Sequence, residues 1–558
     1  MDYPELALHI AGRWRTQTQG GRRAVIDPAT EETIAHLPLA GREELAEAAE
    51  AARRGFIQWR AKSALERCNI LRAAAQKIRE QAKTIAQVLT LEQGKPLAES
   101  VREVTLSADI VDFQAEEAKR LYGRLVPPRV EGILSQAVVR RPVGPVAAFT
   151  PWNFPANLPA RKLASALAAG CSVVIKPAEE TPGTCMLLVR AFLDAGVPPE
   201  ALNMVCGDPA EVSSFLIDHP AIAKVSFTGS VAVGKLLGEQ AARHVKRFTG
   251  ELGGHAPVIV CEDADFPFAL KSSIAAKFRN AGQVCASPIR FYIPRSRFGE
   301  WSEAFVQAAR ALRMGPGTDA ATQMGPLAHA RRIEDMQRFV DDAVERGAQL
   351  LCGGQRAQRP GYFFEPTVIA NAPPDSRVMR QEPFGPIAVL QPYDTLDEAI
   401  DSANALPYGL GAYAFTRDLH TAHRLGEALE AGMVGINHFG VSQPEMPFGG
   451  WKESGIGQEM GAEGLLHYTE VKTLTVGVPA RRKFPETTHD IDRCRRSGGT
   501  QARQRPVPVA PHGPSAGHAE GEAGHHRARR GLLDLGCRRP QDARRRRRPV
   551  GREPRPQQ

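Results

Sequence analysis

A cysteine and a glutamate, 34 residues apart, are the side chains of this sequence best suited to covalent chemistry. Cys285 ends the short segment Gly-Gln-Val-Cys at 282–285, and Glu251 begins Glu-Leu-Gly-Gly at 251–254. A thiolate is a strong nucleophile and a nearby carboxylate can activate water, so the pair suits chemistry at a carbonyl carbon. A single cysteine is more often a buried packing residue, and we expect that role for Cys171 and Cys261, which lie beside core strands.

An amide that could stabilise a developing oxyanion lies in Thr-Pro-Trp-Asn-Phe-Pro at 150–155, after a predicted strand. The two prolines restrict the backbone around Asn153, so its side-chain NH₂ could donate to an oxyanion. The alternative is a rigid turn that packs Trp152 into the core. Both interpretations can hold, because they use different residues.

Two further segments have the composition of a nucleotide site. Residues 227–234 (Phe-Thr-Gly-Ser-Val-Ala-Val-Gly) follow a predicted strand and should open a helix whose amides could hold a phosphate. Position 236 is Leu, where the magnesium site of a P-loop requires Ser or Thr, so we exclude an NTPase. Lys176 and Glu179 follow another strand and could bind a ribose. A plain strand–helix turn and a solvated ion pair are the simpler interpretations.

Two rigid loops and two arginines complete the set of candidates. Residues 381–386 and 447–450 combine Gly and Pro with aromatic side chains, and ordinary loop packing would also explain them. Arg161 and Arg279 could bind an anion, although structural ion pairs are the simpler explanation.

The elements that must position these residues alternate between helices and strands. Residues 42–52 and 71–89 have helical spacing, and residues 121–141 indicate a protruding hairpin. From residue 143 onward, short apolar runs alternate with helical stretches, and a second series of this kind follows Cys285. The alternation predicts two α/β domains with mainly parallel sheets.

The composition is that of a globular protein, with 42% hydrophobic and 24% charged residues. No run of about twenty apolar residues predicts a membrane span, and the first residues do not resemble a signal peptide. The nine cysteines include no Cys-x-x-Cys pair. Their scatter argues against a zinc site or a disulfide framework and favours a cytoplasmic location.

The formal charge of +9 comes from the C-terminal segment. Residues 481–558 hold 20 of the 71 Lys and Arg but only 8 of the 62 Asp and Glu, so the preceding residues are slightly acidic. Apolar residues are too sparse in 479–558 for a core, which predicts a disordered Arg- and Pro-rich tail. Nucleic-acid binding is one interpretation of the tail. We favour a non-native extension, such as a shifted reading frame in GC-rich DNA, because nearly all of its basic residues are Arg.

Seven segments, taken together and in order, resemble the signatures of the aldehyde dehydrogenase family over residues 5–478. They lie at 151–155, 176–179, 227–230, 251–254, 282–285, 382–386 and 447–450. The resemblance implies a Rossmann-type NAD(P)-binding domain at 1–120 and 142–253 and a catalytic α/β domain at 254–440. It also implies a β-hairpin oligomerisation arm at 121–141 and 465–478, and therefore a homodimer or homotetramer.

The resemblance further implies roles for the site residues. Cys285 would attack the aldehyde, Asn153 and the Cys285 N–H would stabilise the oxyanion, and Glu251 would activate the water that hydrolyses the thioester. Glu459 matches a position proposed in relatives to assist proton transfer. The implied cofactor-binding residues are Trp152, Lys176, Glu179, Gly229, Ser230, Gly234, Glu382 and Phe384. No metal is implied.

The cofactor and substrate preferences also follow from the resemblance. Because a carboxylate at Glu179 accepts a 2′-OH but repels a 2′-phosphate, we predict NAD, with NADP accepted if Glu179 swings away. Arg161, Arg279 and Ser442 fall where succinate-semialdehyde dehydrogenases bind the substrate carboxylate, which implies succinate semialdehyde or a similar aldehyde. Glutarate semialdehyde, 2-oxoglutarate semialdehyde and uncharged aldehydes are alternatives, and Glu251 disfavours a CoA-acylating enzyme.

Two positions depart from the family pattern. Gly250 stands where relatives usually have a larger apolar residue, and its backbone freedom could loosen the placement of Glu251. Ser287 stands where some relatives have a second cysteine, so we predict no redox switch between this position and the nucleophile.

Overall fold

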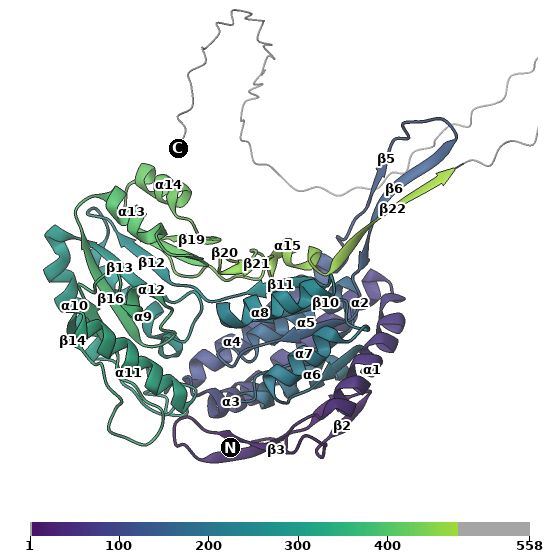
Figure 1. Cartoon of the computed structure of the whole chain (residues 1–558), viewed down its shortest axis with the longest axis horizontal. Helices are drawn as coiled ribbons and strands as arrows, with labels where there is room; N and C mark the ends of the chain where they lie inside the picture. The colour runs from purple at the N-terminus through teal and green to yellow at the C-terminus, as the bar shows by residue number, and fades with distance from the viewer. Residues whose placement is uncertain (1–2, 478–558) are drawn as a thin grey trace, which may run out of the picture. The chain divides into compact units, whose positions relative to one another are not determined.

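The computed structural model describes residues 3–477, so the predictions for the tail at 479–558 and for residue 478 of the arm lie outside the described residues. The first of its two large sheets has eight strands in the order β2-β1-β9-β8-β7-β10-β11-β21 (Figure 1). The five central strands are parallel. They are β7 (Val146–Phe149), β8 (Val173–Lys176), β9 (Leu202–Met204), β10 (Lys224–Thr228) and β11 (Arg247–Glu251). The antiparallel edge strands are β1 (Leu8–Ile10), β2 (Arg13–Arg15) and β21 (Gly455–Ile456).

The strand order of this sheet contains a topological switch point. The chain runs outward through β7, β8 and β9, then returns to place β10 and β11 on the other side of β7. The connections after β7 and β10 therefore leave in opposite directions, which opens a crevice at the carboxyl edge where open α/β sheets bind ligands. Asn153, Gly229 and Glu251 all lie at this edge. The prediction of a parallel α/β sheet for this half of the chain is confirmed.

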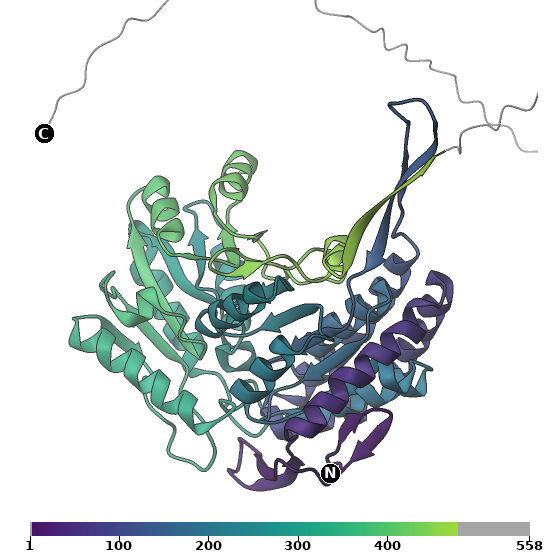
Figure 2. The ribbon, with the colours of Figure 1, turned by 45° about the vertical axis from the view of Figure 1, so that its right-hand side comes forward.

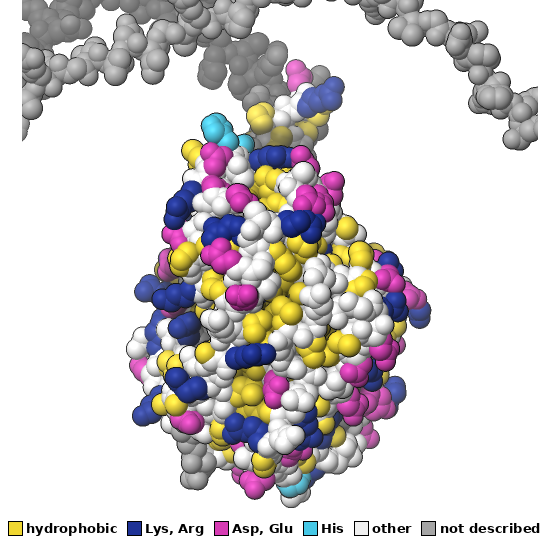
Figure 3. Space-filling model, turned by 90° about the vertical axis from the view of Figure 1, so that its left-hand side faces the viewer, with side chains coloured by type: hydrophobic (Ala, Val, Ile, Leu, Met, Phe, Trp, Pro, Cys, Tyr) yellow, Lys and Arg dark blue, Asp and Glu magenta, His cyan; other side chains and the backbone are white. Residues whose placement is uncertain are grey.

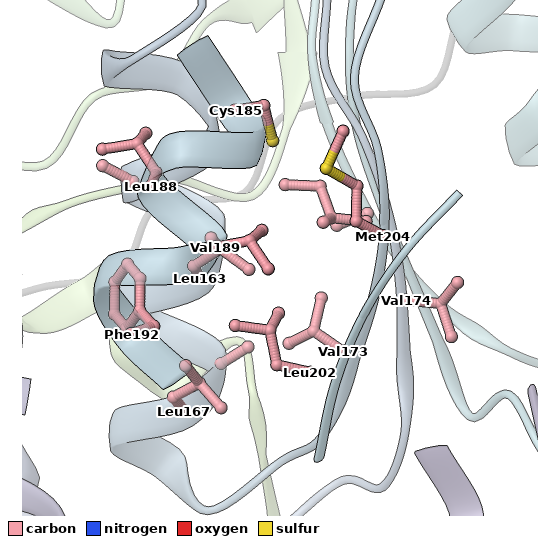
Figure 4. Packing of buried hydrophobic residues seen from close by; sticks show 14 of the residues in the cluster. Leu163, Leu167, Val173, Val174, Cys185, Leu188, Val189, Phe192, Leu202 and Met204 are labelled. Atoms are coloured by element: carbon pink, nitrogen blue, oxygen red, sulfur yellow. The ribbon is translucent and has the colours of Figure 1, made fainter. Parts of the chain in front are cut away.

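Helices pack against the first sheet and bury one continuous apolar core. Those that connect its strands are α5 (Asn157–Ala169), α6 (Pro182–Asp194), α7 (Pro209–Asp218) and α8 (Val231–Arg243). Figure 4 shows side chains of α5 and α6, such as Leu163 and Val189, on the side that faces Val173 of β8 and Leu202 of β9. Removing these side chains from water supplies most of the favourable free energy of folding.

Four helices lie in the chain between the edge strand β2 and the first central strand, β7. They are α1 (Arg42–Arg60), α2 (Ala64–Glu80), α3 (Ala82–Gln93) and α4 (Leu97–Ala118). The helical spacing predicted over 71–89 is confirmed, but the residues divide between two helices, because Gln81 ends α2 and begins α3. α3 ends at Gly94 in the left-handed conformation (φ 94°), a position that favours glycine.

The second sheet has seven strands in the order β14-β15-β16-β13-β12-β18-β19. All are parallel except β14 at one edge. The strands are β12 (Ala256–Val260), β13 (Pro288–Pro294), β14 (Gln349–Cys352), β15 (Thr367–Ala370), β16 (Ile387–Tyr393), β18 (Gly411–Phe415) and β19 (Met433–Ile436). Its helices are α9 (Phe266–Phe278), α10 (Phe298–Arg310), α11 (Ala330–Glu345), α12 (Arg377–Arg380), α13 (Leu396–Asn404) and α14 (Leu419–Ala428). The prediction of a second α/β series after Cys285 is confirmed.

A three-stranded antiparallel arm projects from the body in both ribbon views (Figures 1 and 2). It consists of β5 (Arg124–Val126), β6 (Ile133–Pro142) and β22 (Thr469–Gly477). The hairpin predicted at 121–141 is therefore present, and β22 pairs with β6 along its whole length. Leu125 and Leu134 are 80% and 70% exposed, so the arm presents apolar side chains to its surroundings.

One face of the described residues carries side chains of both charges (Figure 3). On the face seen in Figure 3, basic and acidic side chains are interspersed, and a band of apolar side chains runs between them. None of the helices between residues 3 and 477 is long and apolar enough to cross a membrane.

Candidate active site

Loops from both sheets meet at one site. Asn153 follows β7 and Glu251 ends β11 of the first sheet, whereas the loops that contain Cys285 and Glu382 precede β13 and β16 of the second. Hydrogen bonds join the two sides: Asn153 Nδ2 donates to the Gln283 carbonyl (3.1 Å), and the Gly254 amide donates to Glu382 Oε1 (3.1 Å). The carboxyl edge of one sheet thus faces the amino edge of the other.

A left-handed turn places Cys285. Asn280, Ala281 and Gly282 have φ values of 48°, 51° and 73°, and a Cβ at 282 would overlap the backbone of Gly385. Only glycine fits this approach, which explains the small residues before the cysteine. The Cys285 side chain is half-buried. Burial raises the pKa of its thiol to about 12, while the positive charge of Arg161 acts in the opposite direction.

Asn153 is buried and points toward the cysteine loop. Its Nδ2 bonds the Gln283 carbonyl, and its Oδ1 has no hydrogen-bond partner among residues 3–477. Trp152 is half-buried and packs edge-on against Phe384, with ring centroids 5.5 Å apart, and against His329 at 5.4 Å. Trp152 therefore belongs to the site rather than to the sheet core.

Glu251 lies in an apolar setting beside a second carboxyl group. Both of its side-chain oxygens are buried without a hydrogen-bond partner in the described part of the chain. Burial and the nearby Glu459 raise the pKa of Glu251 well above its usual value, and the charges of Lys162 and Arg161 oppose this shift. Lys162 Nζ lies 2.5 Å from Glu459 Oε1, with both side chains fully buried. Lys162 therefore bonds Glu459 directly and acts on Glu251 only through its charge.

The expectation that Gly250 loosens Glu251 is wrong. Gly250 lies within β11, opposite Phe227 of β10 on one side and Ile456 of β21 on the other. Pairing on both sides fixes its backbone regardless of glycine's intrinsic freedom. The Phe248 ring occupies the space beside it, so that a Cβ at 250 would lie only 2.7 Å from Phe248 Cε1.

The candidate nucleotide residues line the carboxyl edge of the first sheet. Lys176 Nζ and Glu179 Oε1 are 2.5 Å apart and both side chains are buried, so the solvated ion pair considered from the sequence is wrong. Ser230 caps α8 by accepting from the Val233 amide. The Gly229 amide donates to the Glu251 carbonyl (3.1 Å), and Gly234 packs so closely that a Cβ would overlap Leu252. These glycines allow close approach of backbone and side chains.

Glu382 and Phe384 lie on the opposite wall. Burial raises the pKa of Glu382 to about 7, and a Cβ at Gly253 would overlap its carboxylate. Phe384 has φ 48°, and Arg332 holds this turn by donating to the Pro383 and Phe384 carbonyls. The buried polar groups on both walls fit a dinucleotide: a lysine–carboxylate pair for one ribose and a second carboxylate for the other.

The candidate substrate residues are brought together only in part. Arg161 is 6% exposed, and its Nη2 donates to Ser442 Oγ (2.8 Å) while its Nε donates to Asn157 (2.7 Å). Its Nη1 is buried without a partner among residues 3–477, and the guanidinium lies 4.3 Å from the Phe448 ring centroid. Arg279 is exposed and lies 5.6 Å from the Phe154 ring centroid. No hydrogen bond within the described residues joins Arg279 to Arg161 or Ser442.

A thiol, an amide donor and a buried carboxyl group thus lie between the two walls that carry the candidate nucleotide residues. A model of the aldehyde dehydrogenase family matches residues 14–474. The chain belongs to the aldehyde dehydrogenase family. It is an oxidoreductase that acts on aldehydes, and the cofactor of this family is NAD or NADP.

Relatives of this aldehyde dehydrogenase act on several aldehydes or alcohols according to their names. It is 46% identical to 4-(hydroxymethyl)benzenesulfonate dehydrogenase TsaD1 of Comamonas testosteroni, over 84% of this chain and 97% of the relative. It is 39% identical to succinate-semialdehyde dehydrogenase [NADP(+)] GabD of Escherichia coli, with the same coverage. A crystal structure of succinate-semialdehyde dehydrogenase from Burkholderia pseudomallei has 40% identity and a TM-score of 0.83, covering 85% of this chain and 98% of that one.

Sequence reasoning missed three buried cations of the site: Lys162, Lys277 and Lys95. Lys162 pairs with Glu459, which is 297 residues away, and Lys277 lies against Ser287 (3.3 Å) and acts on Glu382. The available signal for Lys162 and Lys277 was a lysine within a largely apolar helical stretch, whereas Lys95 lies in a Gly-Lys-Pro segment that gives no such signal. A buried lysine needs a partner that the local sequence does not reveal.

Proposed function

We propose that this aldehyde dehydrogenase oxidises an aldehyde with a distal carboxylate, such as succinate semialdehyde, and prefers NAD. The observation that carries the proposal is the free Nη1 of Arg161. A buried guanidinium nitrogen without a partner favours an anion, and Phe448 links Arg161 to the apolar cluster that contains Cys285. Ser442 holds the guanidinium in place, and the exposed Arg279, which lies beside Phe154, contributes a second positive charge.

Cys285 is the proposed nucleophile. Its thiol loses a proton to solvent, helped by the charge of Arg161, and the sulfur adds to the aldehyde carbon. The resulting oxyanion accepts hydrogen bonds from Asn153 Nδ2 and the Cys285 N–H. NAD, when bound, supplies the acceptor for the hydride that leaves this carbon, and a thioester on Cys285 remains.

Glu251 is the proposed base for hydrolysis of the thioester. Its side chain is buried, and burial and the nearby Glu459 raise its pKa, which favours the protonated form. Water that enters after acylation solvates the carboxyl group, which then releases its proton to solvent. The carboxylate takes a proton from the attacking water, the acid product leaves, and the Cys285 thiolate is restored.

The proposed cofactor site uses residues from both walls. Lys176 and Glu179 hold the adenosine ribose. Ser230 and the turn that contains Gly229 and Gly234 approach the pyrophosphate. On the opposite wall, Glu382 binds the nicotinamide ribose, and Phe384 and Trp152 flank the ring. The Glu179 carboxylate is the reason to expect NAD rather than NADP.

An aldehyde with a distal sulfonate is a second candidate. The relative at 46% identity is named for a benzenesulfonate, and a guanidinium binds sulfonate oxygens as well as carboxylate oxygens. A panel of succinate, glutarate and 2-oxoglutarate semialdehydes, 4-formylbenzenesulfonate and pentanal, each with NAD and NADP, distinguishes these classes by kcat/KM. Cys285→Ser should abolish NADH formation, and product should form without CoA. If pentanal were the best substrate, the anion site would be assigned wrongly.

The domain boundaries and the oligomer are also proposals. The first sheet with its helices (1–120 and 142–253) would bind the cofactor, and the second (254–440) would carry the nucleophile. The arm, with exposed Leu125, Leu134 and Val471, would bury these residues against another copy. Light scattering of the full chain and of a Leu125→Lys/Leu134→Lys variant tests this, because the double variant should be smaller.

A further inference from the structure

A buried ion pair connects the start of helix α4 to the amide loop of the active site. Lys95 and Glu103 are 1% and 5% exposed, and Lys95 Nζ lies 2.6 Å from Glu103 Oε2. Lys95 Nζ also donates to the main-chain carbonyl of Asn153 (2.7 Å). The lysine therefore bonds the very residue whose side chain is proposed to bind the oxyanion.

The carboxylate of the same pair holds the other end of this loop. Glu103 Oε1 accepts from the amides of Ala156 (2.9 Å) and Asn157 (3.2 Å). Lys95 and Glu103 thus fix the backbone on both sides of Phe154 and Pro155. Charge-assisted hydrogen bonds between buried groups are shorter and stronger than neutral ones, so they define the position of this backbone closely.

A second donor reaches the same carbonyl from the cysteine loop. Asn280 Nδ2 donates to the Asn153 carbonyl (3.0 Å), and Asn280 Oδ1 accepts from Gln93 Nε2 (2.8 Å). Gln93 Oε1 in turn accepts from the Lys95 amide (3.1 Å). The chain from Gln93 to Glu103 therefore contacts both the amide loop and the turn that precedes Cys285.

We infer that Lys95 and Glu103 are positioning residues that hold Asn153 in register with Cys285, an inference that rests on the oxyanion role proposed above for Asn153. The Asn153 carbonyl accepts one bond from Lys95 and one from Asn280, so its position depends on both sides of the site. Loss of the lysine removes one of these bonds and leaves Glu103 as an unpaired buried charge. The amide would then move relative to the reacting carbon, and displacements of about 1 Å at such a site can cost about a hundredfold in rate.

The test is a double-mutant cycle between Lys95→Met and Asn153→Ala, measured as kcat/KM for the best aldehyde and as Kd for NAD. Asn153→Ala should lower kcat/KM by about 10²- to 10³-fold, as loss of one oxyanion donor does. Lys95→Met should lower it by about 10- to 100-fold while leaving the Kd for NAD within about twofold. Because Lys95 acts through Asn153, the double variant should be within about threefold of Asn153→Ala alone.

A purely structural role gives a different pattern. Arg67→Met is the matched control, because Arg67 is a buried cation (8% exposed) whose Nε and Nη1 donate to the Ala168 and Lys62 carbonyls, away from the site. It should lower the Tm without a selective loss of kcat/KM. If the losses from Lys95→Met and Asn153→Ala multiply, Lys95 does not act through Asn153 and the inference fails. If Asn153→Ala retains full activity, the oxyanion role itself is wrong, which separates the two failures.

Asn280→Ala provides a second route if Lys95→Met does not fold. This change leaves the ion pair intact and removes the Asn280 bonds to the Asn153 and Gln283 carbonyls, together with the bond accepted from Gln93. Asn280 has φ 48°, a conformation that Asn adopts more readily than Ala, so the Tm of this variant is measured beside its kcat/KM. The variant should also lower kcat/KM by about tenfold and lose this effect in an Asn153→Ala background. An unchanged kcat/KM in Asn280→Ala would contradict the inference.

Discussion

Replacement of Arg161 should discriminate between anionic and uncharged aldehydes by a predictable amount. Three nitrogens of its guanidinium could bind a ligand, but Nε and Nη2 are used by Asn157 and Ser442, which leaves Nη1. One charge-assisted hydrogen bond contributes about 1.5–3 kcal/mol, and about 1.4 kcal/mol corresponds to a tenfold change. Arg161→Gln should therefore lower kcat/KM for succinate semialdehyde by about 10- to 150-fold relative to pentanal.

The ratio of the two substrates is the quantity to measure. Arg161 also opposes the rise in the pKa of the Cys285 thiol, so its loss slows every aldehyde, and only the ratio isolates substrate binding. NADH formation at saturating NAD gives kcat/KM for both substrates in one assay. Arg279→Gln is the comparison variant, and its smaller effect, below about tenfold, follows from its exposure. An equal loss with both aldehydes in Arg161→Gln would refute the reasoning.

Three further results are expected. Glu251→Gln should release about one NADH per site and then stop, because the thioester is no longer hydrolysed. In the unaltered enzyme, hydrolysis of the thioester should fail as the pH drops through a midpoint above 4.5, because protonation of a carboxyl group with a raised pKa removes the base. Rapid-quench measurements of NADH formation test this role. If the burst and steady-state rates of Glu251→Gln equal those of the unaltered enzyme, Glu251 is not the base. Gly234→Ala should lower the free energy of unfolding by about 1–3 kcal/mol, since its Cβ would overlap Leu252. Gly299→Ala should not, because the space beside Gly299 is open. Equal Tm values for the two variants would exclude overpacking at Gly234. Glu179→Ser should raise kcat/KM with NADP and lower it with NAD, and an unchanged ratio would remove Glu179 from the choice of cofactor.

The parts of the site that lie close together in the sequence were predictable from it. The strand before Asn153, the cap at Ser230 and the glycine before the cysteine loop each follow from local composition. The order of these segments carried the family resemblance. In each case the physical cause, such as a helix terminus or a close approach of backbones, acts over a few residues.

The parts that depend on long-range packing were not predictable. The Lys162–Glu459 and Lys95–Asn153 contacts join residues 297 and 58 positions apart, and the sequence around each lysine gives no sign of its partner. Gly250 looked flexible because glycine is permissive on its own, but neighbouring strands fix it. Arg279 was expected beside Arg161, and its exposure depends on how a loop of the second sheet meets the first.

The shortest strand of the first sheet has a consequence for how water reaches the base. β21 comprises only Gly455 and Ile456 at the sheet edge, yet it pairs with Glu251 and is followed three residues later by Glu459. Short edge strands open more often than central ones, and each opening of β21 would separate the two carboxyl groups and expose Glu251 to solvent. Amide hydrogen exchange at Leu252, which donates to the Ser454 carbonyl (2.9 Å), would report this opening directly. The opening rate of this two-residue strand would then limit how often the enzyme can begin hydrolysis. If the Leu252 amide exchanges more slowly than the enzyme turns over, opening of β21 does not limit the rate of hydrolysis.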